Sequence, residues 1–328
     1  MHERLPINNF KNKHFIIVLA FIGFSAITCS LSAQLPYDAI YMPKKTVCAV
    51  AAYSYSEWTE YWENTLLRDN ANIGKHIDQS AMLMAAAGLT DRLNLLISLP
   101  YITTKNTQGN LLGQQGIQDL TLQLKYKFYN QKGLSVHGVL GGSMPMSKYV
   151  PDFLPMSIGL HSTNVIGRGI VSYLHQTGLY VTAHGAYIGR SKITVDRDSY
   201  QAYDRVYNSN RVAIPNVTEG GLRLGYLKPT FQVEAFLESS AGVGGDNILR
   251  NNAPFPTNNM TSKSFGGYLK VQPKNIGFSA RIAHVASGRN VGHSIMFMAG
   301  LLYQINPKSR TESTESIDKP HFKIIENQ

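Results

Sequence analysis

The feature that most constrains this chain is an alternation of apolar and polar side chains with a period of two residues. Over 119–128, every second side chain is apolar and the side chains between them are polar. The apolar set is Leu120, Leu122, Leu124, Tyr126 and Phe128, and the polar set is Asp119, Thr121, Gln123, Lys125 and Lys127. Because successive side chains of a strand point to opposite faces, this pattern predicts a strand with one apolar and one polar face.

The same alternation returns along the chain and predicts twelve strands. A tilted strand crosses a bilayer with about 9 to 11 residues, a length that most of these segments reach. The strand at 157–175 contains Gly159, Gly167 and Gly169, which indicate bulges or a break. The predicted strands cover 47–59, 76–88, 91–104, 116–130, 133–145, 157–175, 178–190, 212–228, 230–240, 263–273, 276–287 and 292–305.

The connections between these strands alternate between short and long. Tight turns are expected at 90–91, 131–133, 176–177, 228–229 and 274–275, and long polar loops at 60–75, 105–115, 146–156, 191–211 and 241–262. Short turns on one side and long loops on the other are typical of outer-membrane barrels, which also have an even number of strands. We therefore expect an all-β fold, a transmembrane antiparallel up-and-down β-barrel of about 12 strands spanning 34–305.

Composition excludes several other classes of protein. Only 16% of the residues are charged, and the longest apolar run after Gln34, at 81–87, is far shorter than a spanning helix of about 20 residues. Two cysteines exclude a disulfide-stapled scaffold and a Cys-rich metal module. The formal charge is +10, but Lys and Arg are scattered, so we expect no nucleic-acid partner and instead contact with lipopolysaccharide phosphates.

The two ends of the chain have a different composition from the barrel. Arg4, Lys11 and Lys13 precede an apolar run at 15–27, and small residues at 31–33 follow it, which predicts a signal peptide over 1–33 cleaved between Ala33 and Gln34. An uncleaved anchor and a lipidated Cys29 are the alternatives. The polar stretch 306–328 is expected to be a disordered tail. Residues 298–305 resemble the terminal signal that barrel-assembly machinery recognises, which makes this machinery and outer-membrane lipids expected partners.

Pairing between neighbouring strands can be predicted from the tight turns. If Leu227 pairs with Thr230, Arg223 lies opposite Glu234. If Pro273 pairs with Ile276, Tyr268 lies opposite Arg281. Both registers keep polar side chains on one face and apolar side chains on the other, as a barrel with a lipid-facing surface requires.

The charged residues on the polar faces are the candidate functional residues. Several of them fall at a similar distance from a tight turn, so they should converge at a similar depth in the narrow interior of a twelve-stranded barrel. Charges there either coat a conduit or seal it by pairing with each other. The candidates for lining the lumen are Lys125, Lys127, Arg223, Glu234, Glu238, Lys270 and Arg281.

The stretch 86–145 carries several recognisable motifs: Gly88-Leu89-Thr90-Asp91-Arg92-Leu93, Leu99-Pro100-Tyr101, Gly116-Ile117-Gln118-Asp119-Leu120, Leu124-Lys125-Tyr126 and a small-residue strand ending at Pro145. With these motifs it resembles an outer-membrane barrel family, the "transporter" family named for the meta-pathway of phenol degradation. The resemblance is good over about 60 residues and looser over 157–305. It implies a barrel that passes small, often aromatic or hydrophobic compounds, and it brings no catalytic residues.

The leading hypothesis is an outer-membrane channel for passive or facilitated passage of a small solute, and two other functions are considered. A non-transporting structural or adhesion barrel would work through its long loops. An outer-membrane hydrolase would use His161 and Ser162 with Asn164, but neighbouring strand residues point to opposite faces, so His161 cannot readily activate Ser162. We expect no enzyme activity.

One long loop holds three aspartates that raise the possibility of a calcium site. Asp196, Asp198 and Asp204 share one long loop and could offer oxygen ligands. Arg197 and Arg205 lie among them, which indicates a solvated loop of mixed charge. We expect no metal and no cofactor.

Overall fold

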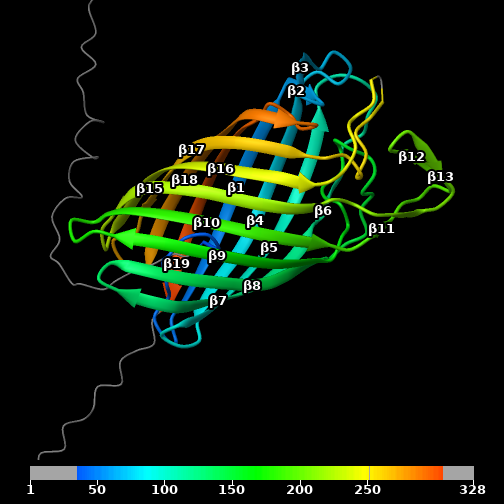
Figure 1. Ribbon diagram of the computed structural model, residues 1–328. Helices are drawn as coiled ribbons and strands as arrows, with labels where there is room; N and C mark the ends of the chain where they lie inside the picture. The colour runs from blue at the N-terminus through cyan, green and yellow to red at the C-terminus, as the bar shows by residue number, and fades with distance from the viewer. Residues whose placement is uncertain (1–34, 251, 306–328) are drawn as a thin grey trace, which may run out of the picture. The chain divides into compact units, whose positions relative to one another are not determined.

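The computed structural model describes residues 35–250 and 252–305, and these form a closed barrel of twelve long antiparallel strands (Figure 1). Each strand pairs with its neighbours in the chain, and β1 pairs with β19 from Val47–Ile305 to Glu57–Ile295, which closes the sheet. The twelve strands are β1 (Val47–Trp58), β4 (His76–Gly88), β5 (Leu93–Asn106), β7 (Asp119–Gln131), β8 (Leu134–Pro145), β9 (Asn164–Leu174), β10 (Leu179–Arg190), β15 (Asn216–Leu227), β16 (Phe231–Val243), β17 (Thr261–Val271), β18 (Ile276–Arg289) and β19 (Ile295–Ile305).

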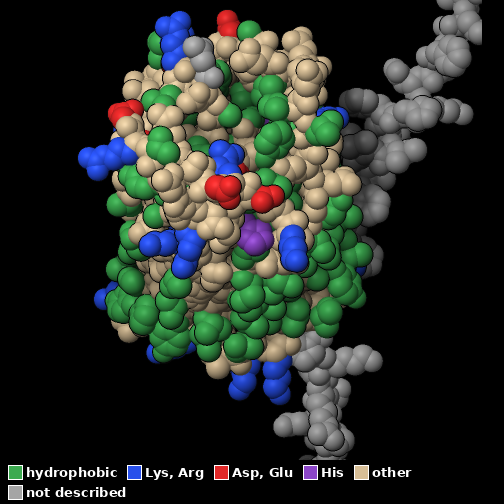
Figure 2. Space-filling model, turned by 90° about the vertical axis from the view of Figure 1, so that its right-hand side faces the viewer, with side chains coloured by type: hydrophobic (Ala, Val, Ile, Leu, Met, Phe, Trp, Pro, Cys, Tyr) green, Lys and Arg blue, Asp and Glu red, His purple; other side chains and the backbone are tan. Residues whose placement is uncertain are grey.

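The period-two pattern sorts side chains between the outside and the lumen. On β7, Leu122 and Leu124 are exposed on the outside, whereas Gln123 and Lys125 are buried inside. On the face shown in Figure 2, hydrophobic side chains cover the lower half and most charged side chains lie above them. This is the arrangement expected of a barrel with an apolar outer band facing lipid.

The connections differ at the two ends of the barrel, as predicted. One end, which we call the turn end, has short connections such as the one between β7 and β8. The other, the loop end, carries small extra strands that pair among themselves or extend the sheet (Figure 1). These are β2 (Glu60–Glu63), β3 (Leu66–Asp69), β6 (Gln115–Ile117), β11 (Ile193–Thr194), β12 (Tyr200–Ala202), β13 (Arg205–Tyr207) and β14 (Arg211–Val212).

The two largest errors in the predicted strand bounds are early starts. The sixth begins at Asn164 and not at 157, because His161 has a φ of 55° and such left-handed backbone interrupts a strand. The eighth begins at Asn216 and not at 212, directly after Pro215, which has no N–H to donate to the ladder.

One of the two predicted registers is correct. Tyr268 lies opposite Arg281, as expected. Arg223, in contrast, lies opposite Phe236, and Glu234 lies opposite Gly225, because the turn joins Leu227 to Gln232. The shift is two residues, so every side chain keeps its predicted face.

Within 35–250 and 252–305, no helix is long and apolar enough to cross a membrane. The predicted signal peptide with its cleavage site at Ala33 and the predicted tail at 306–328 lie outside the described residues.

Candidate functional site: a charged lumen occupied by the N-terminal segment

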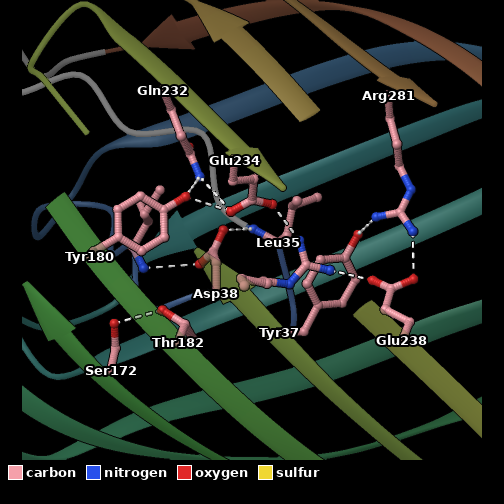
Figure 3. A network of polar contacts seen from close by, with 12 residues as sticks. Leu35, Tyr37, Asp38, Ser172, Tyr180, Thr182, Gln232, Glu234, Glu238 and Arg281 are labelled. Atoms are coloured by element: carbon pink, nitrogen blue, oxygen red, sulfur yellow. Dashed lines mark hydrogen bonds and ion pairs between the residues drawn. The ribbon is translucent and has the colours of Figure 1, made fainter. Parts of the chain in front are cut away.

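The residues that precede the first strand, 35–46, contribute to the inside of the barrel, and we call them the N-terminal segment. Lys125 on β7 is fully buried, and its Nζ donates to the Asp38 carboxylate at 2.9 Å. The same Nζ donates to the carbonyl oxygens of Leu35 and Ile40, each at 3.2 Å (Figure 3). A lysine of the barrel wall therefore binds the N-terminal segment at three residues, Leu35, Asp38 and Ile40.

Asp38 shapes the segment as well as binding the wall. Its carboxylate accepts hydrogen bonds from the backbone N–H groups of Leu35, at 2.7 Å, and Ile40, at 2.9 Å. Aspartate favours such local bonds in turns because its short side chain reaches nearby backbone donors. The turn that results directs the two carbonyl groups toward Lys125.

Tyr37 is the second anchor of the N-terminal segment. The Arg223 guanidinium lies 4.0 Å from the centre of its ring, and the His184 ring stacks on it at 5.7 Å. Arg281 donates a hydrogen bond of 3.3 Å to the Tyr37 hydroxyl. Burial raises the pKa of this hydroxyl, although Arg281 and Arg223 oppose the shift, so the phenol is neutral at pH 7.

Around Tyr37, charged side chains from three strands form one network (Figure 3). Arg223 on β15 pairs with Glu234 and Glu238 on β16. Arg281 on β18 pairs with Glu238 at 2.6 Å. The Tyr180 hydroxyl donates to Glu234 and receives a hydrogen bond of 2.9 Å from Gln232. Such pairing offsets part of the cost of burying each charge.

Four cations of the lumen each have a carboxylate partner. A further pair, Arg168 on β9 with Glu219 on β15 at 2.6 Å, adds to the network. The four pairs are Lys125 with Asp38, Arg168 with Glu219, Arg223 with Glu234, and Arg281 with Glu238. Charge is therefore balanced within these four pairs, and one of the carboxylates comes from the N-terminal segment.

Lys127 and Lys270 complete the set of predicted lumen residues. Lys127 is partly exposed, and its Nζ lies 4.4 Å from the centre of the Tyr41 ring, which also stacks on His137 at 5.1 Å. Lys270 is buried on β17, and within the described part of the chain it forms no ion pair. These two lysines leave the interior with a positive surplus toward the turn end.

The N-terminal segment lies between two cavities. The first has a volume of about 350 Å³ and is lined by Leu35, Pro36 and Tyr37 together with β1, β4, β5, β7, β18 and β19. The second has a volume of about 270 Å³ and is lined by 38–41 together with β7, β8, β9, β10, β15 and β16. The two sides of the segment therefore face different parts of the interior.

All seven side chains predicted from the sequence point into the lumen. The structure brings Arg223, Glu234, Glu238 and Arg281 into one network. Lys125 binds the N-terminal segment, and Lys127 and Lys270 lie closer to the turn end. Sequence reasoning missed Tyr37, Asp38 and Tyr41. One signal was present, since the predicted set holds five cations and two carboxylates and Asp38 is the nearest acidic residue before the first strand.

The residues considered for a hydrolase are not arranged as a catalytic pair. The Ser162 hydroxyl donates to the Asn164 side chain at 2.5 Å and is buried. The His161 ring packs edge-on against Tyr149 at 4.9 Å. No hydrogen bond joins His161 to Ser162 within the described residues, so the base does not reach the hydroxyl that it would activate.

Comparisons with known proteins identify the fold. No protein-family model matches the chain, and no curated protein matches it. Among solved structures, the chain is similar to the crystal structure of the COG4313 outer membrane channel from Pseudomonas putida F1, at 17% identity and a TM-score of 0.66, over 84% of this chain and 100% of that chain.

Two porins are more distant. The KdgM porin is 8% identical over 78% of this chain and 99% of its own, and the NanC porin is 10% identical over 79% of this chain and 100% of its own, each with a TM-score of 0.44. At such identities a likeness concerns the fold alone. The likeness to the COG4313 channel, at a TM-score of 0.66, shows that the chain has the fold of an outer-membrane β-barrel.

Proposed function

We propose that the protein is an outer-membrane channel for passive or facilitated passage of small solutes, closed in this state by its N-terminal segment. The observation that carries the proposal is the nature of the interior. Small barrels that serve only as scaffolds fill the lumen with side chains of their own strands. Here a segment of the chain that belongs to no strand occupies the lumen, beside two cavities.

The segment is held by contacts that can be released. Its anchors are one ion pair, a few hydrogen bonds and the cation–π contacts of Tyr37 and Tyr41, each worth about 1 to 3 kcal/mol. If the segment leaves, water replaces these contacts on Lys125 and Arg223. We infer that opening requires movement of the segment and leaves the barrel wall in place.

The proposal includes finer points that agree with the sequence. The resemblance of 86–145 suggests the barrel family of the phenol meta-pathway and solutes that are small and aromatic or hydrophobic. We propose export by the predicted signal peptide, insertion by the barrel-assembly machinery and contact of the basic surface with lipopolysaccharide.

A non-transporting structural barrel is the second candidate. It is favoured by the balanced pairing of Lys125, Arg168, Arg223 and Arg281, which would also suit a permanently sealed lumen. The two candidates differ in whether loss of the segment's anchors opens a conduit.

Conductance in planar bilayers separates the two. We compare the wild type with a variant that carries Tyr37→Ala and Asp38→Asn, and with an Asp91→Asn variant, which changes an exposed turn residue. A channel gives openings that are larger or more frequent in the double variant than in the wild type and the control. If all three correctly folded proteins conduct no current, the structural candidate replaces the channel.

A further inference from the structure

We propose that the first cavity is a binding site for a small amphipathic carboxylate, with an apolar body against one wall of the lumen and its carboxylate beside Arg281. This inference rests on the proposed function in one respect: the site is a step in permeation only if the protein is a channel. Binding itself can be measured without transport.

The apolar wall of the cavity comes from neighbouring strands. Met82 and Met84 on β4 and Met296 and Met298 on β19 flank Val50 on β1, which lies between these two strands in the sheet. Methionine side chains are flexible and polarisable, so they adapt to irregular apolar ligands and make favourable contacts with aromatic rings. In a barrel whose lumen conducts only water and ions, inward positions such as these are expected to be polar.

Polar side chains lie on both sides of this apolar wall. Arg281 on β18 neighbours β19 on one side, and Ser98 on β5 with Thr121 and Gln123 on β7 follows β4 on the other. Tyr37 of the N-terminal segment also lines the cavity. Each of these groups can donate a hydrogen bond, and among the described residues no aspartate or glutamate lines the cavity. A ligand group that accepts hydrogen bonds and carries a negative charge suits the side of Arg281.

Arg281 has capacity for such a ligand. A guanidinium carries five N–H donors, and within the described residues Arg281 donates two hydrogen bonds, one to Glu238 and one to Tyr37. Its guanidinium carbon lies 4.1 Å from the centre of the Phe236 ring, a cation–π contact. A carboxylate bound here would add a charge-assisted hydrogen bond without displacing Glu238.

The size of the cavity limits the ligand. At about 350 Å³ it lies at the lower end of small-molecule sites, which span about 300 to 1,000 Å³. A single ring or a short alkyl chain with one carboxylate fits this range. Phenylacetate serves as the probe. Acetate is the control that has the carboxylate without the ring, and 2-phenylethanol is the control that has the ring without the negative charge.

The first experiment uses the unmodified protein. In detergent micelles, with methionine methyl groups labelled with ¹³C, phenylacetate is expected to shift the signals of Met82, Met84, Met296 and Met298. Met144 and Met146, which are exposed outside the cavity, should not move. Acetate should cause no saturable shift. If phenylacetate leaves the four cavity signals unchanged, or moves all methionines alike as a detergent-soluble additive would, the site assignment is wrong.

The second experiment uses matched variants and calorimetric titration. Val50→Phe fills the cavity, whereas Ala51→Phe places the same ring on the lipid-facing side of the same strand. We expect Val50→Phe to weaken phenylacetate binding at least tenfold and Ala51→Phe to leave it unchanged. Arg281→Gln should weaken phenylacetate about tenfold and 2-phenylethanol less than threefold, the size expected for one charge-assisted bond.

The outcomes separate this inference from the proposed function. A wild-type protein that conducts but does not bind phenylacetate overturns the binding site and leaves the channel standing. A protein that binds phenylacetate but never conducts, even with its segment anchors removed, overturns the channel and leaves the site. Equal loss of acid and alcohol binding in Arg281→Gln would refute recognition of the carboxylate.

Discussion

At the scale of single residues, Lys125 explains why the N-terminal segment lies where it does. A lysine that is wholly inside the barrel wall loses its hydration, which costs several kcal/mol unless a partner is near. Asp38 and two backbone carbonyl groups provide that partner. The side chain and the segment therefore stabilise each other, and weakening the pair should loosen the segment first.

Cys48 reports on this loosening. It is fully buried at the start of β1 and packs with Met42 of the N-terminal segment. We expect Asp38→Asn to raise the rate of Cys48 alkylation by a maleimide about tenfold, because losing one partner of a buried pair costs about 3 to 5 kcal/mol and displacing the segment relieves part of that cost. The rate is measured by mass spectrometry on folded protein.

The Asp91→Asn variant is the control, since Asp91 lies exposed in a tight turn. An alkylation rate in Asp38→Asn that equals the rates of the wild type and this control would show that Asp38 does not hold the segment.

At the scale of elements, the strands follow directly from their side-chain alternation. On β7, the fourth and fifth residues point to opposite sides, Leu122 outward and Gln123 inward. The outward face meets hydrocarbon, in which a charge is costly, and the inward face meets polar side chains. Substitution of neighbouring residues should therefore give very different results.

We expect Leu122→Arg to reduce assembly far more than Gln123→Arg. Arginine on the lipid face near the midplane costs about 2 to 4 kcal/mol, whereas lumen positions tolerate polar residues. The yield of folded protein in the membrane and its heat-modifiable migration on gels provide the measurement. Similar yields for the two variants would contradict the assigned faces of β7.

The contrast between strands and N-terminal segment shows what could be predicted from this sequence. The strands could be predicted, because two-residue periodicity is local and repeats over many residues, as at 119–128. The Leu227–Gln232 register could not be predicted, because a shift of two residues leaves every side chain on the same face. Only the geometry of the turn decides between the two registers. The position of the N-terminal segment could not be predicted either, because the segment has no periodicity and its position depends on a lysine about 90 residues away.

At the scale of the whole molecule, charge is distributed unevenly along and around the lumen. Methionines and Val50 line the side formed by β1, β4 and β19, whereas the ion pairs lie on strands β7 to β18. Arg281 and Lys125 are each paired with a carboxylate, so a change of either residue to glutamate would break a pair as well as change the potential. Ion selectivity is better tested at a lysine without such a partner.

Lys127 is suited to this test. It is partly exposed, lines the second cavity and contacts the Tyr41 ring, and within the described residues it forms no ion pair. If solutes pass this point, its positive charge attracts anions, because charges in a narrow low-dielectric passage set the local potential. We expect Lys127→Glu to lower the anion-to-cation permeability ratio by about twofold or more, read from the reversal potential under a salt gradient. Lys132→Glu changes the net charge equally in the exposed turn after β7 and should leave the ratio nearly unaltered. Equal shifts from both variants would mean that only the net charge of the molecule matters and that the conduit does not pass Lys127.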